Sequence, residues 1–311
     1  MLDKVIKKDC IEGLKDQKDE SVDLIIADPP YFKVIGKKWD YKWSTIEDYC
    51  KWSESYFTEL YRVLRKGGTF YLFGYFRSLI HLIPILEKIG FELRQQIIID
   101  KGIKSVSGRA TKDYKMFPNT TESIIFLVKD SKPYIKKLLK ERQKSLKLSS
   151  KDINEQLGVK SNGGGMWSIY TGNNMCKQLP TREQWNKLCE ILNITDIPYF
   201  SFSQTYNAQL GCTDVWNDID FYKESRIHPT QKPIDLINRL ILTSSNKGDI
   251  ILDPFMGSGA TAISALINDR HFIGFEIDDE YYNSCIERID NYKNTGIDNL
   301  CKKTKNKKTQ Q

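Results

Sequence analysis

The sequence predicts an α/β fold built on a mainly parallel sheet, with a mostly helical subdomain inserted into it. Short apolar runs alternate with longer segments of helical periodicity towards both ends of the chain, which is typical of βαβ folds. Most of these runs are too apolar to leave one face in water, as expected for strands covered on both sides. The alternation stops between residues 129 and 226, and this interruption indicates the inserted subdomain.

The helices and strands of the sheet can be placed in order along the chain. "STIE" at 44–47 predicts a capping box, with Ser44 as N-cap and Glu47 at the third helical position. A second helix is expected over about 77–89, and Pro233 suits the first turn of a third. The predicted strands are the apolar runs 4–8, 22–27, 69–73, 93–99, 122–128, 249–253 and 271–276.

The interrupting segment is basic and rich in glycine and asparagine. Residues 129–151 contain nine Lys or Arg against two acids. The stretch "LSSKDINEQLGVKSNGGGMWSIYTG" fits a helix, a turn and a second helix, with Ser150 capping the first and Gly158 closing it. Such a unit reads the major groove of DNA, whereas a basic face that only contacts phosphates is an equally good interpretation.

Composition limits the class of protein. The net charge of +7 permits a polyanionic partner without requiring one. Seven cysteines without a CxxC pair and only three histidines suggest neither a disulfide framework nor a metal site. The charged N-terminus and the lack of an apolar run of about 18 residues predict a cytoplasmic protein with no membrane partner.

The stretch "GDIILDPFMGSGATAISALI", residues 248–267, predicts a ligand site. A strand delivers Asp253, and Gly257 and Gly259 then let the backbone approach a ligand before a helix begins. Glu276 ends the next strand, 17 residues after Gly259, which matches the acid that accepts hydrogen bonds from ribose hydroxyls. Because the loop is not GxGxxG, the arrangement favours an adenosine cofactor without phosphate, and S-adenosyl-L-methionine fits that description.

The stretch "VDLIIADPPYF", residues 22–32, predicts a second site at the end of a strand. The lone pair of an exocyclic amine on a nucleobase is conjugated into the ring, so the amine is a poor nucleophile. The carboxylate of Asp28 and the carbonyl of Asp28 or Pro29 could each accept one N–H and favour a tetrahedral nitrogen. Pro29 and Pro30 remove competing amide donors, and Tyr31 offers a ring on which a base can stack. Positioning would supply most of the catalysis.

These motifs resemble the amino-methylating DNA methyltransferases of the permuted β class. "KVIKKDCIEGLKDQKDESVDLIIADPPYF", "RIHPTQKPIDLINRLI", "DPFMGSG" and "GFEID" carry the resemblance, and their order along the chain is that of the family. The resemblance implies a seven-stranded, Rossmann-like methyltransferase sheet with one antiparallel strand near its edge. Together with the change of pattern at 129–226, it divides the chain into a catalytic part (1–128), a target-recognition insert (129–226) and a cofactor part (227–300). The basic tail (301–311) is predicted to be disordered, because it contains almost no apolar residues.

The resemblance also assigns roles to individual residues. It makes Asp28, Pro29, Pro30 and Tyr31 the catalytic motif. It implies that Asp9 contacts the adenine amine of the cofactor, that Thr230 and Lys232 lie near its methionine end, that Asp253, Phe255 and Gly257 line its pocket, and that Glu276 holds its ribose.

The activity implied is sequence-specific transfer of a methyl group to N6 of an adenine flipped out of double-stranded DNA. The aspartate of the DPPY motif favours adenine, and cytosine N4 is the alternative because both amines need the same two acceptors. The loop 101–120 holds five basic residues and either contacts DNA around the flipped base or is a solvated loop.

Two other functions fit the sequence less well. A DNA-binding relic would have no reason to keep both sites, and the absence of GxGxxG disfavours a nicotinamide or flavin oxidoreductase. The sequence leaves open whether the protein forms a homodimer and whether a cognate restriction endonuclease accompanies it.

Overall fold

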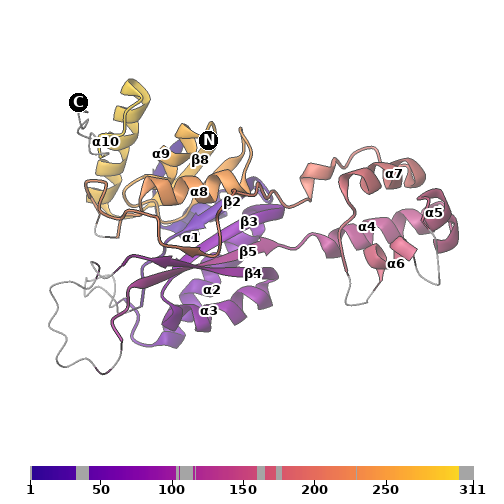
Figure 1. Ribbon diagram of the computed structural model, residues 1–311, viewed down its shortest axis with the longest axis horizontal. Helices are drawn as coiled ribbons and strands as arrows, with labels where there is room; N and C mark the ends of the chain where they lie inside the picture. Colours follow the sequence, from indigo (N-terminus) through magenta and orange to yellow (C-terminus); the bar gives the residue numbers. More distant parts are fainter. Residues whose placement is uncertain are drawn as a thin grey trace, which may run out of the picture.

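The computed structural model describes residues 2–32, 42–102, 105, 115, 117–159, 165–172, 177–228 and 230–300. The tail 301–311, predicted to be disordered, and most of the loop 101–120, predicted either to contact DNA or to be solvated, lie outside these residues. The described chain forms one sheet flanked by helices, with a group of four helices standing to one side (Figure 1). The strands lie in the order β1 (Lys4–Lys7), β8 (His271–Glu276), β7 (Ile250–Asp253), β2 (Val22–Ala27), β3 (Leu64–Gly74), β5 (Thr121–Lys129), β4 (Phe91–Asp100) and β6 (Val215–Trp216).

The sheet is mixed, because β5 runs antiparallel to both β3 and β4 while the other pairs are parallel. All seven predicted strands form. The prediction of seven strands was nevertheless wrong by one, because β6 adds an eighth among the described residues. Its two residues carry no periodicity of their own, and they pair with the exposed edge of β4 through Ile98 and Val215.

The two predicted sites lie on neighbouring strands. β2 pairs with β7 in parallel, with Leu24 opposite Ile251 and Ile25 opposite Leu252. Adjacent strands of a sheet are about 4.8 Å apart, and parallel strands end at the same edge. The loops that follow β2 and β7 therefore meet, although they come from opposite ends of the chain.

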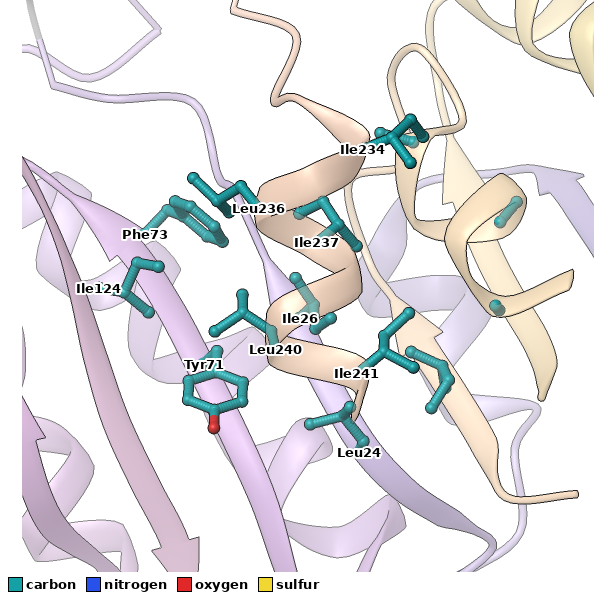
Figure 2. Packing of buried hydrophobic residues seen from close by; sticks show 14 of the residues in the cluster. Leu24, Ile26, Tyr71, Phe73, Ile124, Ile234, Leu236, Ile237, Leu240 and Ile241 are labelled. Carbon is teal, nitrogen blue, oxygen red and sulfur yellow. The ribbon is translucent and has the colours of Figure 1, made fainter. Parts of the chain in front are cut away.

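One face of the sheet is covered by α8 (Ile234–Ser244), α9 (Ala260–Ile267) and α10 (Asp279–Thr295). Full burial of a large aliphatic side chain stabilises a fold by about 1.5 to 3 kcal/mol, so this layer fixes α8 against the sheet. Pro233 was predicted in the first turn of this helix, but it is the N-cap, one residue before α8 begins. Figure 2 shows Ile234, Leu236, Ile237, Leu240 and Ile241 of α8 packed against Leu24, Ile26, Tyr71, Phe73 and Ile124 of the strands.

The other face carries α1 (Cys10–Lys15), α2 (Ile46–Val63) and α3 (Phe76–Ile89). The capping box of α2 was predicted one residue too early. Thr45 is the N-cap, and its hydroxyl accepts from the amide of Asp48 at 3.1 Å while the Asp48 carboxylate accepts from the Thr45 amide at 3.3 Å. The sequence "STIED" contains two overlapping hydroxyl and acid pairs, and the fold uses the second.

The four helices beside the sheet have a hydrophobic core of their own. They are α4 (Lys132–Ser145), α5 (Ser150–Gln156), α6 (Gly165–Thr171) and α7 (Arg182–Leu192), followed by the 3-10 turn η3 (Tyr199–Ser201). Ser149, and not Ser150, caps α5 through the amide of Asp152, again because two adjacent serines compete. This core contains Ile135, Leu139, Ile153, Leu157, Trp167, Tyr170, Trp185, Leu188, Leu192, Ile194 and Phe202.

After η3 the chain returns to the sheet. Tyr206 stacks on Phe126 with ring centroids 6.2 Å apart, and the amide of Asn207 donates to the carbonyl of Thr243 at 2.7 Å. Trp216 belongs to the core between the sheet and α8. The predicted insert 129–226 thus contains a helical unit and a returning segment that packs on the sheet. In the part of the chain that the structure describes, no helix has the length and apolarity needed to cross a membrane.

Candidate active site

A cavity of about 380 Å³ lies where the loops after β2 and β7 meet. Its walls come from the beginning of the chain, from the segment before α8, and from the loops after β7 and β8. Eleven of the twelve residues predicted for the two sites line it: Asp9, Asp28, Pro29, Pro30, Tyr31, Thr230, Lys232, Asp253, Phe255, Gly257 and Glu276. The fold therefore brings the two predicted sites together into a single cavity.

Gly259 is the predicted residue that does not line the cavity. Its φ of +79° is in the left-handed region, and a Cβ built there would lie 2.7 Å from the Sγ of Cys285 on α10. Glycine is required at this position so that α9 can begin against α10. The expectation that Gly259 lets the backbone approach a ligand stays a prediction.

Gly257 and Glu276 form one wall of the cavity. Gly257 has φ +50°, and its amide donates to Oε2 of Glu276 at 2.8 Å. Oε1 of Glu276 accepts from the amides of Ile277 and Asp278, both at 2.9 Å. Burial raises the pKa of Glu276, although these backbone amides oppose the shift. The carboxylate is held in one orientation by three amides.

Asp253 is 5% exposed and bonds within its own loop. Oδ2 accepts from the hydroxyl of Thr261 at 2.6 Å, and Oδ1 accepts from the amide of Phe255 at 2.9 Å. Burial raises the pKa of Asp253 to about 7, against the opposing effect of these two donors. Asp253 thus links the end of β7 to α9 and shapes the turn that holds Gly257.

Aromatic side chains form another wall. Phe255 contacts the ring of Tyr56 edge-on, with centroids 5.2 Å apart, and lies 5.9 Å from Trp52. Trp43 and Trp52 line the cavity as well. The sequence reasoning missed both tryptophans, because aromatic residues before and within an amphipathic helix look like ordinary core. Opposite them, Asp9 caps α1 by accepting from the amide of Ile11 at 2.9 Å.

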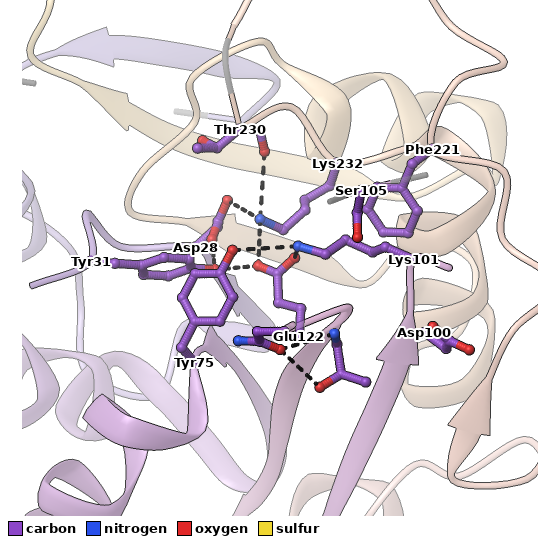
Figure 3. A network of polar contacts seen from close by, with 12 residues as sticks. Asp28, Tyr31, Tyr75, Asp100, Lys101, Ser105, Glu122, Phe221, Thr230 and Lys232 are labelled. Carbon is purple, nitrogen blue, oxygen red and sulfur yellow. Dashed lines mark hydrogen bonds and ion pairs between the residues drawn. The ribbon is translucent and has the colours of Figure 1, made fainter. Parts of the chain in front are cut away.

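The carboxyl group of Asp28 contacts the side chains of Tyr31 and Lys232 (Figure 3). Oδ1 lies 2.6 Å from the hydroxyl of Tyr31, and Oδ2 accepts from Nζ of Lys232 at 2.7 Å. Lys232 also donates weakly to the carbonyl of Thr230 at 3.5 Å, and the Thr230 hydroxyl lies 3.1 Å from Nδ1 of His228. The "HPTQKP" segment therefore reaches the DPPY motif directly through Lys232.

Glu122 completes this network, and the sequence reasoning did not identify it. It is 4% exposed, and Oε1 lies 2.5 Å from the Tyr31 hydroxyl and 3.0 Å from Nζ of Lys232. Oε2 lies 3.5 Å from Nζ of Lys101, which in turn lies 3.4 Å from the hydroxyl of Tyr75. An acid one residue into a strand usually marks an exposed end. Because β5 is antiparallel, its beginning lies at the edge where β2 and β7 end, and this placement is the signal that could have found Glu122.

The charges of this network shift the pKa of each member. Burial raises the pKa of Asp28, and the proximity of Glu122 adds to that rise. Burial alone would raise the pKa of Glu122, but Lys232 and Lys101 outweigh it and lower the value. Burial would lower the pKa of Lys232, whereas the nearby Asp28 and Glu122 hold it well above its usual range. The pKa of Tyr31 is raised by burial and by both acids.

Comparison with known proteins identifies the chain. A family model described as DNA methylase, covering N6 and N4 enzymes, matches residues 22–287. The chain belongs to this family. It is 30% identical to the DNA adenine methyltransferase YhdJ of Escherichia coli K12, over 97% of this chain and 88% of that protein.

Solved structures share the fold. The complex of M1.HpyAVI with SAM has a TM-score of 0.54 at 19% identity and covers 92% of this chain and 98% of its own. The PvuII DNA methyltransferase, described as cytosine-N4-specific, has a TM-score of 0.52 at 16% identity, with 93% and 90% covered. These structures show that the chain has the α/β methyltransferase fold. Its family makes it a DNA methyltransferase that depends on S-adenosylmethionine.

The cavity suits this cofactor. Its volume of about 380 Å³ is that of a site for a small organic molecule. Aromatic rings offer faces for a purine, and the carboxylates of Asp9 and Glu276 are acceptors for amine and hydroxyl groups. Gly257 presents only backbone on that wall, where the nearest atom to a built Cβ would be 3.8 Å away in His228.

Proposed function

We propose that this methyltransferase transfers a methyl group to N6 of adenine in double-stranded DNA, at a sequence chosen by the helical insert. The observation that carries the proposal is that Asp28 and Glu276 line one cavity at the tips of a continuous set of parallel strands. The DPPY motif, with aspartate in its first position, and the 30% identity to a DNA adenine methyltransferase support adenine as the base.

The cofactor would lie between the aromatic wall and the Gly257–Glu276 wall. Glu276 is oriented to accept from ribose hydroxyls, Asp9 to accept from the adenine amine, and Phe255 and Gly257 to bound the pocket. Thr230 and Lys232 face the region of the methionine end, next to Asp28. When bound there, S-adenosylmethionine supplies an electrophilic methyl group on its sulfonium.

The target amine would be held by the DPPY motif. The side chain of Asp28 is 20% exposed, so an acceptor oxygen can be reached from the cavity. Asp28 and the carbonyl of Pro29 would each accept one N–H and turn the nitrogen lone pair towards the methyl group. Pro29 is buried and Pro30 half-buried, which fixes this turn. The base must leave the DNA stack to reach the motif, as in other enzymes that modify bases.

The insert would bind the DNA backbone and choose the sequence. Lys137, Lys140, Lys144 and Lys147 are exposed on or just after α4 and give the insert a basic surface. Lysine side chains of this kind bind phosphates. Trp167 and Tyr170 of α6 are buried in the insert core, so the sequence is read by other side chains.

The test follows tritiated methyl label from S-adenosylmethionine into DNA and identifies the labelled nucleoside. We expect N6-methyladenine from the wild type, and a loss of about 10²- to 10³-fold in rate for Asp28→Ala because one preorganised acceptor is removed. Asp28→Asn keeps an acceptor oxygen and should retain more activity than Asp28→Ala.

Asp290→Ala is the matched control, because Asp290 is exposed on α10. Label recovered as N4-methylcytosine would overturn the choice of base. Label that never enters DNA would overturn the proposed activity.

A further inference from the structure

A single hydroxyl lies between two carboxyl groups in the active site. The oxygen of Tyr31 is 2.6 Å from Oδ1 of Asp28 and 2.5 Å from Oε1 of Glu122. A phenol has one proton and can donate one strong, linear hydrogen bond. If both carboxyls were ionised, one of these short contacts would join two oxygens without a proton between them. The geometry therefore requires one further proton on the Asp28 and Glu122 pair.

The surrounding charges indicate which carboxyl carries that proton. Glu122 faces two ammonium groups, Lys232 at 3.0 Å and Lys101 at 3.5 Å. Asp28 bonds to one, Lys232 at 2.7 Å. Opposite charges favour the ionised form of an acid, so Glu122 is the carboxylate and Asp28 the carboxylic acid. The raised pKa of Asp28 and the lowered pKa of Glu122 agree with this assignment.

This assignment orders the hydrogen bonds into a chain. Oδ1 of Asp28 donates to the Tyr31 oxygen, and the Tyr31 hydroxyl donates to Oε1 of Glu122. Oδ2 of Asp28 then remains an acceptor on the side of Lys232 and the cavity. We propose that Asp28, Tyr31 and Glu122 form a relay that removes the proton released by the target amine, with Glu122 as the final acceptor. The proposal rests on the proposed function, since it concerns the fate of that amine.

The step balances. When the nitrogen forms its bond to the methyl carbon, the electron pair of the carbon–sulfur bond leaves with sulfur, and the nitrogen becomes positively charged. The nitrogen then loses one proton to Oδ2 of Asp28. The proton on Oδ1 passes to the Tyr31 oxygen, and the former Tyr31 proton passes to Oε1 of Glu122. The base, Asp28 and Tyr31 end neutral, and Glu122 later releases its proton to solvent on the side of Lys101, which is 18% exposed.

Glu122→Gln tests the end of the relay. Glutamine keeps the shape and an acceptor oxygen for Tyr31 and Lys232 but cannot take up a proton at the pH of the assay. We expect the single-turnover rate of methyl transfer to fall by about 10²-fold, the lower range for a lost acid–base group. The affinity for S-adenosylmethionine should be unchanged. Glu92→Gln, a partly exposed glutamate on β4 paired with Lys132 and Arg94, is the control and should react as fast as the wild type.

Tyr31→Phe breaks the same relay in the middle while keeping the aromatic ring. If the two residues act in one chain, the Tyr31→Phe/Glu122→Gln double variant should be no slower than the slower single variant. Losses that multiply would show that the two side chains act separately, and would overturn the relay. Thermal unfolding of each variant would reveal a folding defect, and the variant that folds normally would then test the relay alone.

Infrared spectroscopy of the cofactor-free protein in D₂O gives a readout independent of activity. The wild type should show the carbonyl band of a protonated carboxylic acid that is absent from Asp28→Asn, because that variant has no carboxyl group at this position. Asparagine and a neutral carboxylic acid carry the same charge, so the surrounding Lys101, Lys232, Tyr75 and Asp253 contribute equally to both spectra and cancel in the difference.

The outcomes separate the two proposals. If the wild type methylates DNA, the relay alone is refuted when Glu122→Gln reacts equally fast or when Asp28→Asn keeps the acid band of the wild type. A wild type that transfers no label to DNA refutes the proposed function.

Discussion

Replacing Arg288 by Met should destabilise the protein far more than a surface substitution. Arg288 lies on α10 and is 1% exposed. Its Nε and Nη2 donate to both oxygens of Asp298 at 3.0 and 2.6 Å, and Nη1 donates to the carbonyl of Ser258 at 2.9 Å. Glu224, before α8, lies 3.9 Å away. One guanidinium therefore joins the end of the described chain, the glycine loop and the segment that leads to Lys232.

The magnitude follows from what methionine leaves behind. Methionine fills the aliphatic volume of Arg288 but supplies no charge, so the buried carboxylates of Asp298 and Glu224 lose their cation. Removing one partner of a buried ion pair costs about 3 to 5 kcal/mol. Asp298 keeps the amide of Leu300, at 3.2 Å, so we expect the lower end of that range. Adding Asp298→Asn removes the buried charge and should recover at least half of the loss.

The assay is equilibrium unfolding in urea. Arg239→Met is the matched control, since Arg239 makes the same two-point contact with Asp218 at 3.0 and 2.6 Å, but Asp218 is 61% exposed. That variant should lose less than about 1 kcal/mol. Equal losses for the two arginine variants, or an Arg288→Met/Asp298→Asn double variant whose loss is the sum of the singles, would refute the reasoning.

Three further outcomes can be measured. Burial raises the pKa of Asp253 to about 7, so the stability that its protonated form contributes is complete below about pH 4 and is lost as the pH rises to 7. The melting temperature of Asp253→Asn should therefore rise relative to that of the wild type across this interval and then level off, whereas a difference that does not change with pH would contradict the raised pKa. Gly259→Ala should cause backbone strain of about 1 to 2 kcal/mol, because φ is left-handed, and also a clash with Cys285. Calorimetry should therefore show weaker cofactor binding than for the control Gly296→Ala, in which the backbone is also left-handed but the new Cβ has no neighbour within 4 Å. Trp185→Ala should lower the free energy of unfolding of the insert core by about 3 to 5 kcal/mol and make the insert sensitive to protease without weakening cofactor binding. A variant that is protease-sensitive and also binds the cofactor weakly would show that the two cores unfold together.

The sheet could be predicted because its strands are locally marked. Runs such as "LIIA" (24–27) and "IIFLV" (124–128) are apolar throughout, and a buried strand suits such a run. The two-residue strand Val215–Trp216 could not be found this way, because its pairing depends on the open edge of β4. Helix starts were misplaced by one residue where adjacent residues offered equivalent caps, as with Ser149 and Ser150.

The site could be predicted where its residues stand together in short motifs. Asp28 and Tyr31 are three positions apart, and Asp253 and Gly257 four, so each motif is visible in the sequence. Glu122, Lys101 and Tyr75 reach the same place from three other segments. Their convergence depends on the reversed direction of β5, which no local pattern encodes.

The position of the helical insert has a consequence for how relatives of this protein could diverge. The insert leaves the sheet after β5 and returns before β6, and the hydroxyl of Ser131 donates to the carbonyl of Phe202 at 2.7 Å where the two connections pass each other. Its apolar residues pack among themselves. A segment cut at these two points could be exchanged between chains. On the proposed role of the insert, such a chimaera would keep its chemistry and methylate a different DNA sequence.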